Sequence, residues 1–147
     1  YDALSSAERG HAAPPRRDLR LETLVEILEG ERLVTAHSYR QDEIIMLIRV
    51  AEEMGFQIGA FTHVLEGYKA SHEIAAHGAG ASTFADDWGS KFAVYDAIPY
   101  NGAMMPADGV VVSFNSDSCH PARHLNFVPS TPVRDGGLRG VAAHPLR

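Results

Sequence analysis

The sequence predicts an α/β fold in which strand–helix units repeat along the chain and build a parallel sheet. Short apolar segments alternate with amphipathic helical segments at intervals of about 25 residues, as is typical of βα units. The strand-like segments, such as 110–112, are continuous apolar runs, a pattern that indicates strands covered on both faces. Polar residues follow the ends of these segments, at the sheet edge where parallel α/β folds carry their chemistry.

The chain opens with an irregular segment and a helix. Residues 1–17 hold proline, alanine and charged residues without any period, so we expect a loop or linker there. Asp18 is an expected N-cap, and Gly30 is an expected helix end. Between them, apolar residues recur at helical spacing at Leu21, Leu24, Val25 and Leu28.

The strand–helix units follow as one domain over residues 18–118. We expect strands over 32–36, 57–62, 79–84 and 109–114, helices over 42–54 and 68–76, and a short helix near Ala103. Residues 119–147 contain Pro121, Pro129 and Pro132. Because a proline inside a helix costs about 3 kcal/mol, we expect this tail to be irregular or degenerate. A complete barrel needs about 250 residues, so four such units correspond to half of one.

Composition excludes several classes of protein. The chain has 147 residues, 45% of them hydrophobic, and a net charge of −6. An acidic chain is a poor partner for nucleic acid or an anionic membrane, and no apolar run approaches the roughly 20 residues of a membrane span. The single cysteine, Cys119, excludes an internal disulfide. Since the first residue is Tyr1, we expect a piece of a longer protein, with the cytoplasm only a default location.

Four polar residues lie just past successive predicted strands: His37, His63, Asp86 and Asp117. Imidazole and carboxylate groups are standard ligands of Zn²⁺ and similar ions. A bound ion lowers the pKa of water to about 7, which suffices for hydrolysis at neutral pH, and Asp117 is a candidate base for the attacking water. We therefore expect His37, His63 and Asp117 to lie within roughly 8 Å of one another.

Three segments carry a resemblance to a known family. They are 37–44 (HSYRQDEI), 61–69 (FTHVLEGYK) and 112–118 (VSFNSDS). Together they resemble the amidohydrolase superfamily, and within it the imidazolonepropionase-like branch, over roughly residues 18–118.

The resemblance implies a (β/α)₈ barrel of which this chain supplies strands five to eight. It implies that His37 and His63 are the fifth- and sixth-strand metal ligands, and that Asp117 is the eighth-strand aspartate that shuttles the proton. His63 and Asp117 are then the catalytic residues. The implied reaction is hydrolysis of an amide, cyclic amide or peptide-like C–N bond in a small molecule, with one or two divalent ions, zinc first among them. The family's first-strand His-x-His pair would precede Tyr1, so we expect the isolated chain to be inactive.

Weaker signals and other interpretations stay open. Tyr39 and Arg40 follow the His37 strand, and we expect them to bind substrate, because arginine grips carboxylates in a bidentate way; a solvent-facing helix start is an equal alternative. A second interpretation is a small, open, doubly wound α/β domain that binds a ligand or partner without metal. A third is an inactive remnant whose exposed barrel edges pair with other copies, since unpaired strand edges invite pairing.

Overall fold

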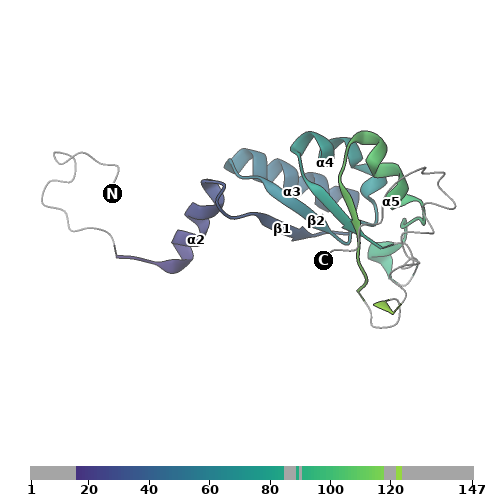
Figure 1. Ribbon diagram of the computed structural model, residues 1–147, viewed down its shortest axis with the longest axis horizontal. Coiled ribbons are helices and arrows are strands. Elements are labelled where there is room, and N and C mark those ends of the chain that lie inside the picture. Colours follow the sequence, from purple (N-terminus) through teal and green to yellow (C-terminus); the bar gives the residue numbers. More distant parts are fainter. Residues whose placement is uncertain (1–15, 85–88, 90, 118–121, 124–147) are drawn as a thin grey trace, which may run out of the picture.

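The computed structural model describes residues 16–84, 89, 91–117 and 122–123. They form an α/β fold with one four-stranded parallel sheet in the order β1-β2-β3-β4 (Figure 1). The strands are β1 (Val34–His37), β2 (Ile58–Thr62), β3 (Gly80–Thr83) and β4 (Val112–Phe114). Each strand therefore lies beside its sequence neighbour. A doubly wound sheet reverses its order at a switch point, whereas a barrel keeps it, so the sheet is consistent with a partial (β/α)₈ barrel.

The connecting helices lie on one face of this sheet (Figure 1). β1 and β2 are joined by α3 (Gln41–Met54), and β2 and β3 by the 3₁₀ turn η1 (Gly67–Lys69) and α4 (Ser71–His77). The helix expected over 68–76 is thus two elements. Between β3 and β4 lie η2 (Phe92–Val94), α5 (Asn101–Met104) and η3 (Met105–Asp108). Parallel crossovers share one hand, which places consecutive helices on the same side of the strands.

The main core fills the space between the sheet and these helices. Ile44 and Ile48 of α3 and Ile74 of α4 pack with Ile58 and Phe61 of β2, and none of the five is more than 5% exposed. The helical spacing of the α3 residues thus correctly predicted its buried face. This layer fixes the strands whose ends carry the candidate site.

The expectation that the strands are covered on both faces is wrong for the described residues. Burial alternates along β3, where Ala81 and Thr83 are buried while Gly80 and Ser82 are partly exposed. On the same open face of β1, Thr35 is exposed. The inner face of a barrel is covered by side chains from the strands opposite, and the four strands described here have no such strands across from them.

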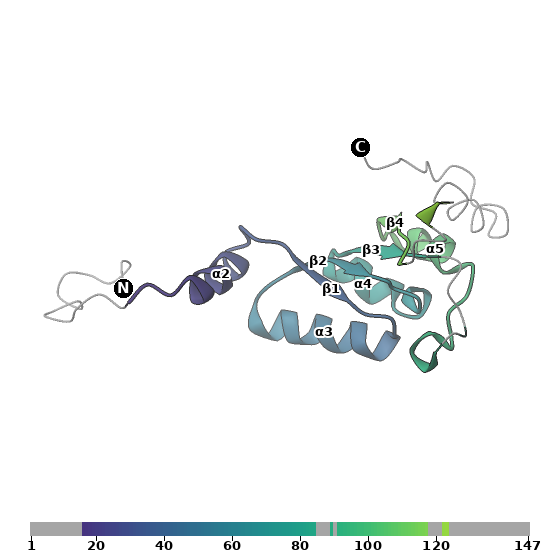
Figure 2. The same ribbon diagram turned by 90° about the horizontal axis from the view of Figure 1, so that it is seen from below.

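The helix α2 (Leu19–Leu28) forms where the sequence predicts it. The Asp18 side chain accepts a hydrogen bond of 2.9 Å from the Arg20 amide and caps the helix. The helix lies apart from the sheet (Figure 2), and its apolar face is not buried, since Leu24 and Leu28 are each 55% exposed. No described helix is long and apolar enough to cross a membrane. Residues 1–15 of the expected linker, Asp86, and the expected tail apart from 122–123 lie outside the described residues.

Candidate functional site

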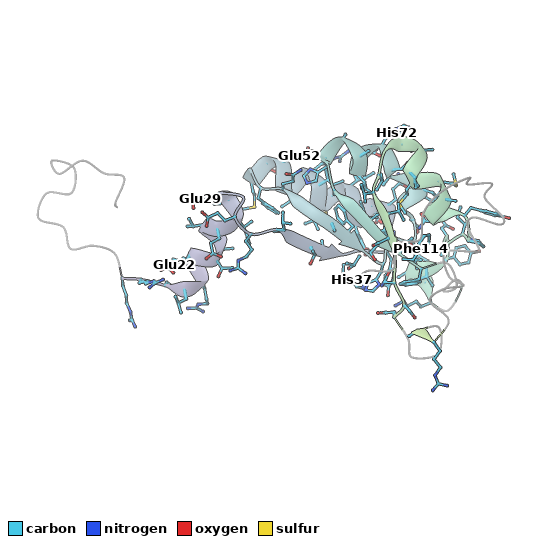
Figure 3. All side chains as sticks on the ribbon, in the orientation of Figure 1. Glu22, Glu29, His37, Glu52, His72 and Phe114 are labelled. Atoms are coloured by element: carbon cyan, nitrogen blue, oxygen red, sulfur yellow. The ribbon has the colours of Figure 1, made fainter. Side chains whose placement is uncertain are left out.

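The predicted site residues gather at the carboxyl-terminal edge of the sheet. His37 is the last residue of β1, His63 directly follows β2, and Asp117 comes three residues after β4. The strand register aligns His37 with Thr62 and continues through β3 to β4. Figure 3 shows His37 at the same end of the sheet as Phe114, the last residue of β4. Parallel pairing thus brings residues distant in sequence to one edge.

Two pairs of predicted residues are in direct proximity. The ring centroids of His37 and His63 are 4.5 Å apart, with an angle of 60° between the ring planes. Nε2 of His63 lies 3.8 Å from Oδ1 of Asp117. The His63 side chain is 15% exposed and that of Asp117 is 57% exposed, so the carboxylate lies on the solvent side of the histidine.

The backbone around His63 is held in an unusual conformation. His63 has a φ of +65°, the only positive value at a described residue other than glycine. Such a residue costs of order 1–3 kcal/mol and persists where its surroundings fix it. The next residue supplies the restraint, because the Val64 amide donates to the Ser82 carbonyl at 3.2 Å and the Val64 carbonyl accepts from Asn101 Nδ2 at 2.5 Å. The turn that orients the imidazole is therefore held by hydrogen bonds to β3 and α5.

Asn115 and Ser82 also belong to the site, although the sequence did not predict either of them as a site residue. Asn115 Nδ2 lies 3.3 Å from Nδ1 of His63, and Asn115 Oδ1 accepts a hydrogen bond of 3.1 Å from Ser82 Oγ. The position of Asn115, directly after a predicted strand and two residues before Asp117, was an available signal. No sequence signal marked Ser82, because a serine within a strand is common and does not indicate a functional site.

The site environment lowers the pKa of His63. Burial is the largest cause, because it disfavours the charged ring, and the nearby His37 and Lys91 act in the same direction. The Asp117 carboxylate opposes them and raises the pKa. The balance favours neutral imidazole, which is the form that binds metal ions.

Replacing Asp117 by asparagine should therefore lower the pKa of His63 further. The substitution removes the one nearby charge that favours the imidazolium and leaves the burial unchanged. An NMR titration of the histidine Cε1 protons measures it, with the exposed His72 of α4 as the internal reference. A His63 pKa that rises in D117N would contradict the assigned contact.

Tyr39 and Arg40 lie in different surroundings. The Tyr39 ring is buried and packs edge-on against His37, with centroids 4.7 Å apart. Its hydroxyl accepts a hydrogen bond of 3.1 Å from Lys91 Nζ. The Arg40 guanidinium is instead held by both oxygens of Asp42, at 2.9 Å each. Tyr39 thus lines the histidine pair, whereas Arg40 already has a carboxylate partner.

The donor set fits part of a metal site. Two imidazoles at this separation suit two ligands of one ion. Within the part of the chain that the structure describes, however, no three His, Cys, Asp or Glu side chains are placed so that together they could hold a metal ion. The described residues therefore supply a portion of a site and not a complete one.

Comparison with known proteins gives one informative match. No protein-family model matches the chain, and neither does any curated protein. Its structure is similar to the crystal structure of an amidohydrolase from Thermotoga maritima MSB8, with a TM-score of 0.73 and 27% sequence identity. The match covers 88% of this chain and 34% of that chain, so this chain spans about a third of that protein's length. The likeness supports a relationship to the amidohydrolase superfamily.

Proposed function

We propose that this chain is a fragment of a metal-dependent hydrolase that acts on C–N bonds of amides, cyclic amides or peptide-like small molecules. The observation that carries the proposal is the contact of His37 with His63, 4.5 Å between ring centroids, beside the Asp117 carboxylate. These groups lie at the strand ends where parallel α/β enzymes hold their catalytic residues. The similarity to an amidohydrolase supports the same reaction class.

Each residue has a proposed role. His37 and His63 bind the ion through neutral imidazole nitrogens, and further ligands come from outside the described residues. A divalent ion, zinc in the first instance, would supply polarisation of the substrate carbonyl and a lowered pKa for water. Asp117, which is half-exposed and adjacent to His63, accepts the proton of the attacking water and delivers it to the leaving nitrogen. Tyr39 closes the side of the site next to His37 and contacts substrate.

Two further proposals concern Arg40 and the place of the four strands in the barrel. Arg40 can bind a substrate carboxylate only by exchanging its two hydrogen bonds to Asp42. We propose that β1 to β4 correspond to strands five to eight of an imidazolonepropionase-like barrel, as the motifs around His37, His63 and Asp117 suggest. The sequential strand order supports a barrel position.

The contact between the histidines also bears on the main alternative. In an open, doubly wound ligand-binding domain, we would not expect the side chains of His37 and His63 to converge on one position. Here their rings are packed together and Nε2 of His63 lies 3.8 Å from the Asp117 carboxylate. This arrangement favours the metal-dependent hydrolase over a domain that binds a ligand without metal.

Zinc titration of the purified chain tests the proposal. We expect added Zn²⁺ to shift the ring signals of His37 and His63 together in NMR spectra, and calorimetric binding to fall below detection in H37Q and H63Q. The matched control is H72Q, because His72 lies on α4 with a side chain that is 86% exposed (Figure 3). Zinc binding that survives both H37Q and H63Q, or that H72Q abolishes, would refute the proposed ligands.

A further inference from the structure

The two ring nitrogens of His63 face different groups. Nδ1 faces the Asn115 amide at 3.3 Å, and Nε2 faces Asp117 at 3.8 Å. A neutral imidazole carries a proton on only one nitrogen, so the partner of Nδ1 decides what Nε2 can do. The group that sets this choice is Asn115.

Asn115 is itself oriented by Ser82. With Ser82 Oγ donating to Asn115 Oδ1, the amide directs its Nδ2 donor at Nδ1 of His63. Nδ1 then has to accept, the ring proton lies on Nε2, and Nε2 points this proton at Asp117. In this state the Nε2 lone pair is absent, and the nitrogen cannot bind a metal ion.

The opposite polarity uses the same three side chains. If the Asn115 amide turns over, Oδ1 accepts from a protonated Nδ1, and Nδ2 donates to Ser82 Oγ. A serine hydroxyl can serve as donor or acceptor, so both states keep the hydrogen bonds between Ser82 and Asn115 and between Asn115 and His63. Nε2 then offers its lone pair toward Asp117.

We propose that Ser82 and Asn115 are positioning residues that select the tautomer of His63, and that metal binding at Nε2 reverses the hydrogen-bond polarity of the chain Ser82–Asn115–His63. Backbone hydrogen bonds hold these three residues, which we call the relay, in place. The backbone amide of Asn115 donates to the Thr83 carbonyl at 2.9 Å, and the backbone amide of Val64 donates to the Ser82 carbonyl at 3.2 Å. Asn115 and the residue after His63 are therefore both fixed to β3, the strand that contains Ser82. The reversal on metal binding rests on the proposed function, whereas the selection of the tautomer without metal does not.

The test is ¹⁵N NMR of the histidine rings in the full chain at a pH where His63 is neutral. Wild type without metal should show the proton on Nε2. In N115D the carboxylate can only accept, so the proton should move to Nδ1 without any metal. In N115L the amide donor at Nδ1 is lost and only Asp117 still favours the proton on Nε2, so the Nδ1-protonated tautomer should gain population relative to wild type. A relay with no influence on the ring would give the wild-type spectrum in both variants, and that result overturns the proposal.

Zinc affinity provides the second readout. Loss of a group that orients a metal-binding histidine typically costs 10- to 100-fold in affinity. We expect a loss of this size in N115L, a smaller one in S82A, and recovery in N115D. The control for S82A is S113A, because Ser113 is the exposed register partner of Ser82 on β4. Unchanged signals of the buried His77 ring, whose Nε2 accepts a hydrogen bond of 3.0 Å from the Ile58 amide, establish in each variant that the chain is folded.

The two readouts separate the inference from the proposed function. A tautomer shift in N115D without any zinc binding would support the relay and refute the metal role. Zinc binding at His63 with equal affinity in wild type and N115L would support the metal role and refute the relay.

Discussion

Replacing Asn101 by alanine should lower the free energy of unfolding by about 3 kcal/mol or more, since each buried polar group left without its partner costs about 1–3 kcal/mol. Asn101 is 1% exposed and is the first residue of α5. Its Oδ1 accepts from the Tyr68 amide at 2.8 Å, and its Nδ2 donates to the Val64 carbonyl at 2.5 Å and to Thr83 Oγ1 at 3.0 Å. One side chain thus joins η1, the turn after His63, and β3.

A loss of this size is a large share of a total stability of about 5–15 kcal/mol, the usual range for single domains. Urea unfolding of wild type and N101A measures it. The control is Y68F, which removes the exposed hydrogen bond of 3.0 Å from the Tyr68 hydroxyl to the Asp96 carbonyl and should cost about 1 kcal/mol or less. Equal unfolding curves for N101A and Y68F would show that the buried network is not a major source of stability.

The same substitution should loosen the site, because Asn101 holds the carbonyl next to His63. Freed from this restraint, the turn can leave the left-handed conformation of His63, whose φ is +65°. The NMR signals of the His63 ring should broaden or shift in N101A under conditions where the chain remains folded. In Y68F they should stay in place.

The local signals in the sequence were sufficient for the helices α2 and α3 and for the order of the strands. Asp18 caps α2, and the apolar spacing that includes Ile44 and Ile48 marks the buried face of α3. Cap chemistry and helical period act within a few residues, so they can be read directly from the sequence. The same holds for the polar residues at the ends of strands, which placed His37 and His63 at one edge.

Features that depend on distant contacts could not be predicted in this way. The bonds of Asn101 to Tyr68, Val64 and Thr83 span 18 to 37 residues of sequence, and an asparagine at a helix start reads only as a cap. Burial of the strands on both faces was a wrong expectation, because a continuous apolar run does not reveal how many strands complete the sheet. The exposed apolar face of α2 has the same origin, since periodicity predicts that a face can be buried and not what covers it.

The isolated chain should show no steady hydrolysis of a panel of cyclic amides and dipeptides, even with zinc added. A catalytic zinc needs about three protein ligands and an open position, whereas no three His, Cys, Asp or Glu side chains among the described residues form such a group. Within the described residues, β1 and β4 also each pair with one strand only, so the sheet does not close around the site and leaves it open to water. Catalysis of this type depends on donors fixed in a water-excluded site, so both deficits act against turnover.

The assay distinguishes a weak site from a contaminating hydrolase through its variants. Any measured turnover should be repeated with D117N and H63Q, and its dependence on protein concentration compared with sedimentation data, because free strand edges favour self-association. Turnover that is lost in both variants would refute the prediction and show that this chain, alone or paired with a second copy, completes a functional site. Turnover that is equal in wild type and both variants comes from another protein and leaves the isolated chain inactive, because neither Asp117 nor His63 takes part in it.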